Sequence, residues 1–174
     1  MRTVFFDVDT QIDFMFPAGA LYVPGAETIL DRVGALNRYA IAHGIPLIST
    51  MDAHTENDPE FDIYPHHCVA GTLGQRKPAE TLVGQHFVAK QKLDCFTSPE
   101  LPGLLARFGA ERYVVYGVVT EICVKLAVTG LLKTGARVEI VMDAVRSLSD
   151  DAAAKWIAEF RASGGALTSS DGLD

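Results

Sequence analysis

Short apolar runs alternate with helix-period segments along most of this chain. Runs of about four to eight mainly apolar residues indicate buried strands, whereas apolar residues that recur every three or four positions indicate amphipathic helices. Ser98-Pro99 is typical of a helix start and Gly135 of a helix end. The pattern predicts strands at 4–8, 46–50, 87–89, 113–117, 138–142 and 166–168, and helices at 26–43, 98–108, 121–133 and 150–162.

This order of elements predicts a parallel sheet, because strands separated by helices pair through right-handed crossovers. We therefore expect one α/β domain over residues 1–174, a three-layer α/β/α fold with a Rossmann-like, mostly parallel six-stranded sheet. One stretch, at about 51–86, is rich in proline, histidine and aspartate and has little periodicity. A loop of that length within a compact domain is usually functional.

Composition is that of an ordinary globular protein, with 48% hydrophobic and 21% charged residues. The net charge of −7, from 15 basic and 22 acidic side chains, disfavours a nucleic-acid partner because no basic row could meet the phosphates. Three scattered cysteines form no disulfide framework and fit a reducing compartment. There is no signal-peptide pattern and no apolar run of membrane-span length, so we expect a soluble cytoplasmic protein with no membrane partner.

Reactive side chains follow four of the predicted strands. Ligands of open parallel sheets bind beyond the carboxyl ends of the strands, so residues at these positions should meet at one edge. The first strand is followed by Asp9, the second by Asp52 and His54, the third by Lys90, and the fourth by a segment that ends at Cys123. The sequence thus predicts a catalytic site at this edge.

Cys123 is the candidate nucleophile. It falls in the first turn of the helix predicted at 121–133, with Thr120 as the expected cap, where free N–H groups and the helix dipole should lower the pKa of the thiol and hold an oxyanion. Asp9 can act as general base for the sulfur, and Lys90 can keep that carboxylate ionised. Taken singly, each has an ordinary alternative: an inert core thiol, a turn cap and a surface lysine.

A metal site is the next constellation. Asp52 and His54 stand two residues apart on an extended segment, and Glu60 and the His66-His67 pair follow in the loop. Mixed carboxylate and imidazole ligation suits zinc, manganese or iron, with open positions for water or substrate. The spacing by itself is a weak signal, since polar loop residues are more often solvated than ligating.

Taken in order, these residues resemble the isochorismatase-like cysteine hydrolases, and within them the nicotinamidase (pyrazinamidase) branch. The likeness spans essentially the whole chain, and five motifs in sequence order carry it. They are Asp9-Thr10-Gln11-Ile12-Asp13-Phe14, Asp52-Ala53-His54, Pro65-His66-His67-Cys68-Val69-Ala70-Gly71-Thr72, Lys90 six residues before Phe96, and Gly117-Val118-Val119-Thr120-Glu121-Ile122-Cys123-Val124.

The resemblance implies an amide hydrolase that converts nicotinamide to nicotinate and ammonia through a cysteine thioester, in the salvage of NAD. It implies a small-molecule amide substrate, a homo-oligomer, and a divalent metal that meets the pyridine nitrogen, zinc first and manganese or iron otherwise. The implied roles are a catalytic triad of Asp9, Lys90 and Cys123; an oxyanion hole of the Val119 and Cys123 amides after a cis Val118–Val119 peptide; substrate contacts by Phe14, Tyr64 and Val118; and metal ligation by Asp52, His54, Glu60 and His67.

Two departures from the family pattern bear on the substrate. Many relatives have histidine where Glu60 stands and alanine where Val119 stands. Glu60 can still ligate as an anion but would change the metal preference, and Val119 narrows the space beside the oxyanion hole. Isochorismatases proper, which hydrolyse a vinyl ether, ureido or carbamoyl amidases, and a non-catalytic family member stay open as alternatives.

A different class of enzyme also matches the first strand. Phe5-Phe6-Asp7-Val8-Asp9-Thr10 resembles the opening motif of haloacid-dehalogenase-type phosphatases, in which Asp7 would be the nucleophile, Asp9 the acid/base and magnesium the cofactor. That class expects a late Gly-Asp motif, which Val141-Met142-Asp143-Ala144 lacks. It also leaves Cys123 and the loop histidines unexplained, so it ranks behind.

Overall fold

Six strands form the centre of the computed structural model, which describes residues 1–173. They are β1 (Thr3–Val8), β2 (Leu47–Asp52), β3 (His86–Lys90), β4 (Arg112–Val118), β5 (Arg137–Arg146) and β6 (Ala166–Thr168). Neighbouring strands follow the order β3-β2-β1-β4-β5-β6 and pair in parallel. The predicted α/β fold with a six-stranded sheet is confirmed, and each predicted strand is present. Asp174, the last residue of the domain predicted at 1–174, lies outside the described residues.

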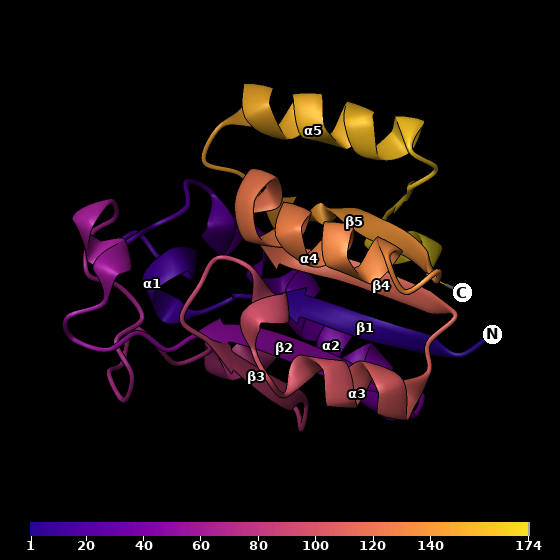
Figure 1. Ribbon diagram of the computed structural model, residues 1–174, viewed down its shortest axis with the longest axis horizontal. Helices are drawn as coiled ribbons and strands as arrows, with labels where there is room; N and C mark the ends of the chain where they lie inside the picture. The colour runs from indigo at the N-terminus through magenta and orange to yellow at the C-terminus, as the bar shows by residue number, and fades with distance from the viewer. Residues whose placement is uncertain (174) are drawn as a thin grey trace.

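Helices lie on both faces of this sheet (Figure 1). The α-helices are α1 (Ile12–Met15), α2 (Leu30–Ala42), α3 (Leu101–Phe108), α4 (Lys125–Leu132) and α5 (Asp150–Ala162). In Figure 1, α2 lies behind the sheet, α3 and α4 lie in front of it, and α5 runs along the top. The strand order moves one way from β1 to β2 and the other way from β4 to β6, so right-handed connections place helices on opposite faces. Within residues 1–173, no helix combines the length and apolarity that a membrane crossing would need.

The central strands are buried because helices cover both faces of the sheet. In β1, residues Val4 to Val8 are at most 1% exposed. The Phe5 ring meets the Tyr116 ring of β4 edge-on at 6.1 Å. Burying a side chain such as Phe5 contributes about 1.5–3 kcal/mol, so a mainly apolar run, rather than an alternating one, is the sequence that this position favours. The exception in this run is Asp7, whose buried carboxylate pairs with Lys77.

The helix predicted at 98–108 begins later, at Leu101. Pro99 disfavours the helical region for the residue before it, and Ser98 is accordingly extended, with φ −71° and ψ 127°. The N-cap residue is Glu100, so the expectation that Ser98 caps this helix was wrong.

The loop between β2 and β3 has little regular structure but is tied to the sheet. Gln11 donates from Nε2 to the carbonyl oxygens of Asp52 at 2.8 Å and Gln75 at 2.7 Å. Its Oε1 accepts the N–H of Asp52 at 2.8 Å. A short parallel bridge joins His54 to Val69. These contacts hold both the start and the later part of the loop beside the end of β1.

Candidate active site

The strand order reverses between β1 and β4, which is where doubly wound sheets open a crevice at the carboxyl ends of their strands. Asp9 follows β1 directly and has a left-handed φ of 50°. The segment that follows β4 ends at Cys123. Asp52 and Lys90 are the last residues of β2 and β3 and stand opposite one another in the sheet. The structure therefore brings together the strand ends that the sequence singled out.

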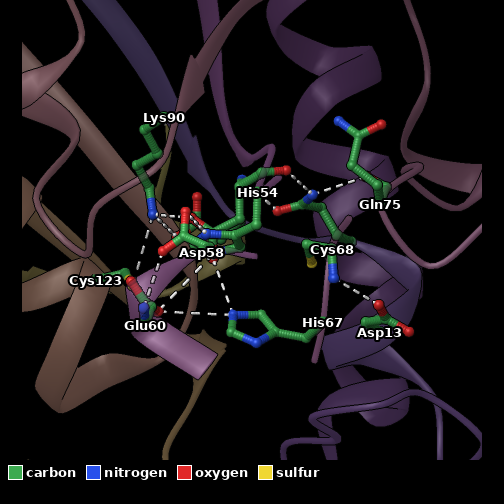
Figure 2. A network of polar contacts seen from close by, with 12 residues as sticks. Asp13, His54, Asp58, Glu60, His67, Cys68, Gln75, Lys90 and Cys123 are labelled. Atoms are coloured by element: carbon green, nitrogen blue, oxygen red, sulfur yellow. Dashed lines mark hydrogen bonds and ion pairs between the residues drawn. The ribbon is translucent and has the colours of Figure 1, made fainter. Parts of the chain in front are cut away.

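The Lys90 side chain joins the other two residues of the predicted triad, and Figure 2 shows its ammonium group directed toward Cys123. Its Nζ lies 2.9 Å from Asp9 Oδ2 and 3.9 Å from Cys123 Sγ, and it also pairs with Asp52 Oδ1. The exposed fractions are 1% for Asp9, 3% for Lys90 and 6% for Cys123. The other oxygen of Asp9 accepts a 2.6 Å hydrogen bond from Thr50 Oγ1. A thiol, a carboxylate and a cation are thus assembled away from solvent.

Burial decides the protonation state of the thiol. It raises the pKa of Cys123 well above its usual value, Lys90 opposes this, and Asp9 adds to it. The expectation that a helix start lowers this pKa was therefore wrong. Burial also raises the pKa of Asp9, although Lys90 opposes it. Burial alone would lower the pKa of Lys90, but the facing Asp9, Cys123 and Asp52 raise it. The resting thiol is protonated, and a base must stand next to it.

The peptide between Val118 and Val119 is cis, as the resemblance predicts. The chain then forms a π-helical turn, Thr120–Val124, before α4 begins. Thr120 is the first residue of this turn rather than its cap, which is Val119, in an extended conformation and without a side-chain cap. Val118, Val119 and Cys123 all line one cavity. Turns of this kind within helices are frequent at functional sites.

A group of metal-ligating side chains lies next to the triad. Asp52, His54 and His67 each offer one ligand atom, and these atoms lie within 4.8 Å of one another. Asp52 Oδ2 is 3.6 Å from His54 Nε2 and 3.7 Å from His67 Nε2. Glu60 Oε1 lies 3.9 Å from the first of these nitrogens and 3.7 Å from the second, as Figure 2 shows for His67. All four predicted ligands are therefore brought together.

The donor atoms suit a divalent metal. Ligand atoms around a tetrahedral zinc ion are about 3.3–3.6 Å apart, given metal–ligand distances of about 2.0–2.2 Å. The separations of the two histidine nitrogens from the Asp52 and Glu60 oxygens, 3.6–3.9 Å, are close to this. Both ring nitrogens of His54 are buried and have no hydrogen-bond partner among residues 1–173. His67 Nδ1 donates to the carbonyl oxygen of Pro65 at 2.7 Å, which leaves the lone pair of its Nε2 free. Zinc, manganese or iron fits this set of donors.

Facing charges shift the pKa values of these ligands. Burial would raise the pKa of Asp52, but Lys90 and His54 hold it well below its usual range. Burial would lower the pKa of His54, but the neighbouring carboxylates of Asp52 and Asp58 raise it to about 9. Burial raises the pKa of Glu60, and the charge of Asp52 adds to the effect. Because ligands bind metal in their deprotonated forms, metal binding must displace protons from this cluster.

One cavity connects the triad with the predicted metal ligands. Phe14 and Tyr64, the predicted substrate contacts, are both in its wall, and the Phe14 ring lies 5.4 Å from the His67 ring. The lining, as far as residues 1–173 show it, contains no lysine or arginine. It consists of Asp9, Phe14, Leu21, Asp52, Glu60, Tyr64, His67, Leu93, Val118, Val119, Ile122, Cys123 and Leu148.

Sequence reasoning missed residues that hold the site in place. Asp13 Oδ2 accepts the N–H of Cys68 at 2.7 Å, although the two residues are 55 positions apart. Asp58 Oδ2 lies 3.0 Å from His54 Nδ1. A signal for Asp58 existed, because an acidic residue directly before a proline is typical of a helix start. No local pattern reports the contact of Asp13.

Asp7, the nucleophile of the phosphatase interpretation, is absent from the cavity lining. It is fully buried and pairs with Lys77 at 2.8 Å. Its oxygens also accept hydrogen bonds from Thr10 at 2.8 Å, Asn37 at 3.0 Å and Ser49 at 3.1 Å. A carboxylate enclosed in this way cannot attack a substrate, so the phosphatase interpretation was wrong.

A thiol, a carboxylate and a lysine buried together at the strand ends of a doubly wound sheet define a hydrolase with a cysteine nucleophile. The chain belongs to the isochorismatase family, whose isochorismatase domain matches residues 3–172. It is similar to pyrazinamidase of Pyrococcus horikoshii, solved in complex with zinc, with 27% identity and a TM-score of 0.91 over 97% of this chain and 99% of that one. Nicotinamidase of Saccharomyces cerevisiae is 21% identical over 189 residues, 83% of this chain and 88% of the relative. Streptothricin hydrolase of Streptomyces noursei is 33% identical over 141 residues, 79% of this chain but 47% of that protein.

Proposed function

We propose that this protein is a nicotinamidase, which converts nicotinamide to nicotinate and ammonia through a thioester on Cys123. The observation that supports this best is that the thiol and three proposed metal ligands, Asp52, Glu60 and His67, line one cavity. A small substrate can therefore present its amide carbonyl to the sulfur and a ring nitrogen to the metal at the same time. The aromatic side chains of the same wall suit a flat ring.

Acylation begins from the protonated thiol. Asp9 accepts the proton of Cys123, and the thiolate attacks the carbonyl carbon of the amide. Lys90, 2.9 Å from Asp9 Oδ2 and 3.9 Å from Cys123 Sγ, stabilises the negative charge as it moves from the carboxylate to the sulfur. The N–H groups of Val119 and Cys123 then hold the oxyanion of the tetrahedral intermediate.

Deacylation uses the same carboxyl group. The intermediate collapses by breaking the C–N bond, and Asp9 returns the proton to the departing ammonia. Asp9 next takes a proton from water, whose oxygen attacks the thioester, and Cys123 regains a proton as the C–S bond breaks. Burial raises the pKa of Asp9, and a more basic carboxylate is a stronger base for both steps.

Asp52, His54, Glu60 and His67 would hold a divalent metal beside the cavity. When bound, the metal supplies a Lewis-acid contact for a ring nitrogen of the substrate. Zinc is the first choice, because two imidazoles and two carboxylates suit it and the pyrazinamidase of Pyrococcus horikoshii was solved with zinc. Manganese and iron accept the same donors.

The cavity lining also bears on the other reactions of the family. Its charged residues, among those the structure describes, are Asp9, Asp52 and Glu60, with no cationic side chain to pair with a carboxylate. In the metal-free cavity, substrates that carry a carboxylate, among them that of isochorismatases proper and acidic carbamoyl compounds, would meet like charge, whereas a bound divalent metal would offset the charges of Asp52 and Glu60. A neutral aromatic amide avoids this repulsion.

Ammonia release from matched carboxamides tests the proposed substrate. We expect turnover of nicotinamide and pyrazinamide. Benzamide has the shape of nicotinamide without the ring nitrogen, so its kcat/KM should be at least about tenfold lower, the effect of losing about 1.4 kcal/mol of contact. Chelation of the metal should abolish most of this difference. Ammonia from ureido compounds but not from nicotinamide would instead favour a ureido amidase.

Replacement of the nucleophile tests the chemistry. Cys123→Ala should abolish turnover and leave the melting temperature unchanged, since the side chain it shortens lines a cavity. Cys95→Ala is the matched control, because Cys95 is also buried and free but lies outside the cavity lining, and it should retain activity. Full activity in Cys123→Ala would overturn the mechanism.

We further propose that the nicotinate enters the salvage of NAD, that the protein works in the cytoplasm and that it forms a homo-oligomer. The cytoplasmic location is supported by the three cysteines. Cys68, Cys95 and Cys123 are all free thiols, and a reducing compartment keeps thiols in this form. Light scattering coupled to size-exclusion chromatography tests the oligomer, and a mass equal to one chain would overturn it.

A further inference from the structure

Asp58 contacts two of the four proposed metal ligands, and the mechanism above does not use it. It is 7% exposed. One carboxylate oxygen lies 3.0 Å from His54 Nδ1, and the other accepts a 2.9 Å hydrogen bond from the N–H of Glu60. We propose that Asp58 is a positioning residue that orients His54 and Glu60 together toward the metal. This inference rests on the metal site of the proposed function.

The contact with His54 decides which ring nitrogen is free. A carboxylate only accepts hydrogen bonds, so a proton on Nδ1 is held against Asp58 and the lone pair remains on Nε2. Both ring nitrogens of His54 are buried and lack a well-aligned hydrogen bond in the described chain. The two differ in their nearest carboxylate: Nδ1 lies 3.0 Å from Asp58 Oδ2, whereas Nε2 lies 3.6 Å from Asp52 Oδ2. A carboxylate behind a ligating imidazole orients the ring and makes it a more basic ligand. Figure 2 shows Asp58 and His54 side by side at the centre of the polar network.

The contact with Glu60 acts through the main chain. Asp58 is the N-cap of a short 3₁₀ turn, Pro59–Asp62, and its Oδ1 accepts the N–H of Glu60. The carbonyl oxygen of Asp58 accepts the N–H of Phe61 at 3.0 Å. This turn brings Glu60 Oε1 to 3.9 Å from His54 Nε2. One carboxylate therefore sets the position of two ligands relative to each other.

The other histidine is oriented in a different way. His67 Nδ1 contacts the carbonyl oxygen of Pro65 at 2.7 Å, a neutral acceptor on the main chain. A change at Asp58 should therefore disturb His54 and leave His67 in place. The expected loss of metal affinity is partial rather than complete.

Asp58→Asn tests this role with little change in shape. If the asparagine Oδ1 keeps the N–H of Glu60, its NH₂ group faces His54 Nδ1, and the ring proton must move to Nε2, where the metal should bind. We expect the dissociation constants for Zn²⁺ and Mn²⁺, measured against competing chromophoric chelators, to rise about 10–100-fold. Asp62→Asn is the matched control: it is an exposed residue of the same turn, carries the same charge change and should bind both metals like the wild type.

Unchanged metal affinity in Asp58→Asn would overturn the role of Asp58. Absence of Zn²⁺ and Mn²⁺ binding by the wild-type chain would overturn the metal site and this role with it. Zinc binding that weakens in Asp58→Asn, in a protein that leaves nicotinamide intact, would support the role and overturn the proposed substrate.

A second measurement does not depend on the folding of the variant. In zinc-loaded wild-type protein, the ring ¹⁵N shifts of His54 should show a metal-bound Nε2 and a protonated Nδ1. Ligation through Nδ1 would contradict the proposal.

Discussion

Lys77 and Asp7 form a buried ion pair, and removing either charge should destabilise the protein. Lys77 Nζ lies 2.8 Å from Asp7 Oδ2, and both side chains are fully buried. Lys77 belongs to the loop between β2 and β3, whereas Asp7 lies in β1, two residues before Asp9. The pair therefore fastens the loop of the proposed metal ligands to the strand that leads to the catalytic base.

The neighbours of each charge decide the size of the effect. In Lys77→Met, the Asp7 carboxylate keeps three neutral donors, from Thr10, Asn37 and Ser49. Breaking a buried ion pair costs about 3–5 kcal/mol, so we expect a loss of about 3 kcal/mol in this variant. In Asp7→Asn, the ammonium group keeps only neutral acceptors, the new amide oxygen and the hydroxyl and carbonyl oxygens of Thr10, and the loss should approach about 5 kcal/mol.

Urea unfolding followed by the fluorescence of Trp156 measures these free energies. A loss of 1 kcal/mol lowers the Tm by about 2–4 °C in a domain of this size, so Lys77→Met should melt about 6–12 °C below the wild type. The double variant Asp7→Asn/Lys77→Met leaves no unpaired charge and should be more stable than Asp7→Asn. A loss below about 1 kcal/mol in Lys77→Met, or a double variant whose loss equals the sum of the two single losses, would refute this reasoning.

Two further substitutions test the neighbours of the site. Burial raises the pKa of Asp9 and the hydrogen bond from Thr50 opposes this, so Thr50→Val should raise that pKa further. The base works as a carboxylate, so activity is present above its pKa and lost as the pH falls through it. The acid limb of the kcat/KM profile should therefore move to higher pH in Thr50→Val. An unmoved acid limb would contradict the role of Asp9 as the base. Gly74→Ala places a Cβ 2.2 Å from the Asp13 carboxylate, and we expect a loss of about 1–3 kcal/mol in unfolding free energy together with weaker zinc binding. Gly103→Ala, with open space around its Cβ inside α3, is the control: it should bind zinc like the wild type and be up to about 1 kcal/mol more stable.

The sheet could be predicted because its central strands are short, mainly apolar runs. Val4 to Val8 is buried throughout, and a short, mainly apolar run of this kind can be recognised as a buried strand from the local sequence alone. The prediction fell short where the pairing is irregular. β5 extends to Arg146, beyond the predicted 138–142, because its pairing with β4 resumes after a register shift, with Gly117 opposite Val145 and Val118 opposite Arg146.

The site was predictable to the extent that strand ends carry it. Asp9 and Lys90 were identified because parallel strands deliver their carboxyl ends to one edge. The pKa of Cys123 was predicted in the wrong direction. A local sequence pattern indicates a helix start, but it does not show which other elements bury the thiol. Asp58 escaped notice for a related reason: its partner is a side chain, His54 Nδ1, whose orientation is fixed only when the loop closes.

The register of β2 and β3 explains how Lys90 serves the triad and the metal ligands together. Asp52 and Lys90 are direct partners at the last step of this pairing, so the ammonium group pairs with Asp52 Oδ1 and still reaches Asp9 Oδ2 at 2.9 Å. Without that cation, two buried carboxylates would raise each other's pKa, as Asp52 already does for Asp9. Successive side chains of a strand point to opposite faces, so a slip of one residue in β3 would turn Lys90 away and deprive both carboxylates of their shared cation. The pairing of Asp52 with Lys90 at the ends of β2 and β3 therefore places one cation where it holds both the catalytic base, Asp9, and a proposed metal ligand, Asp52.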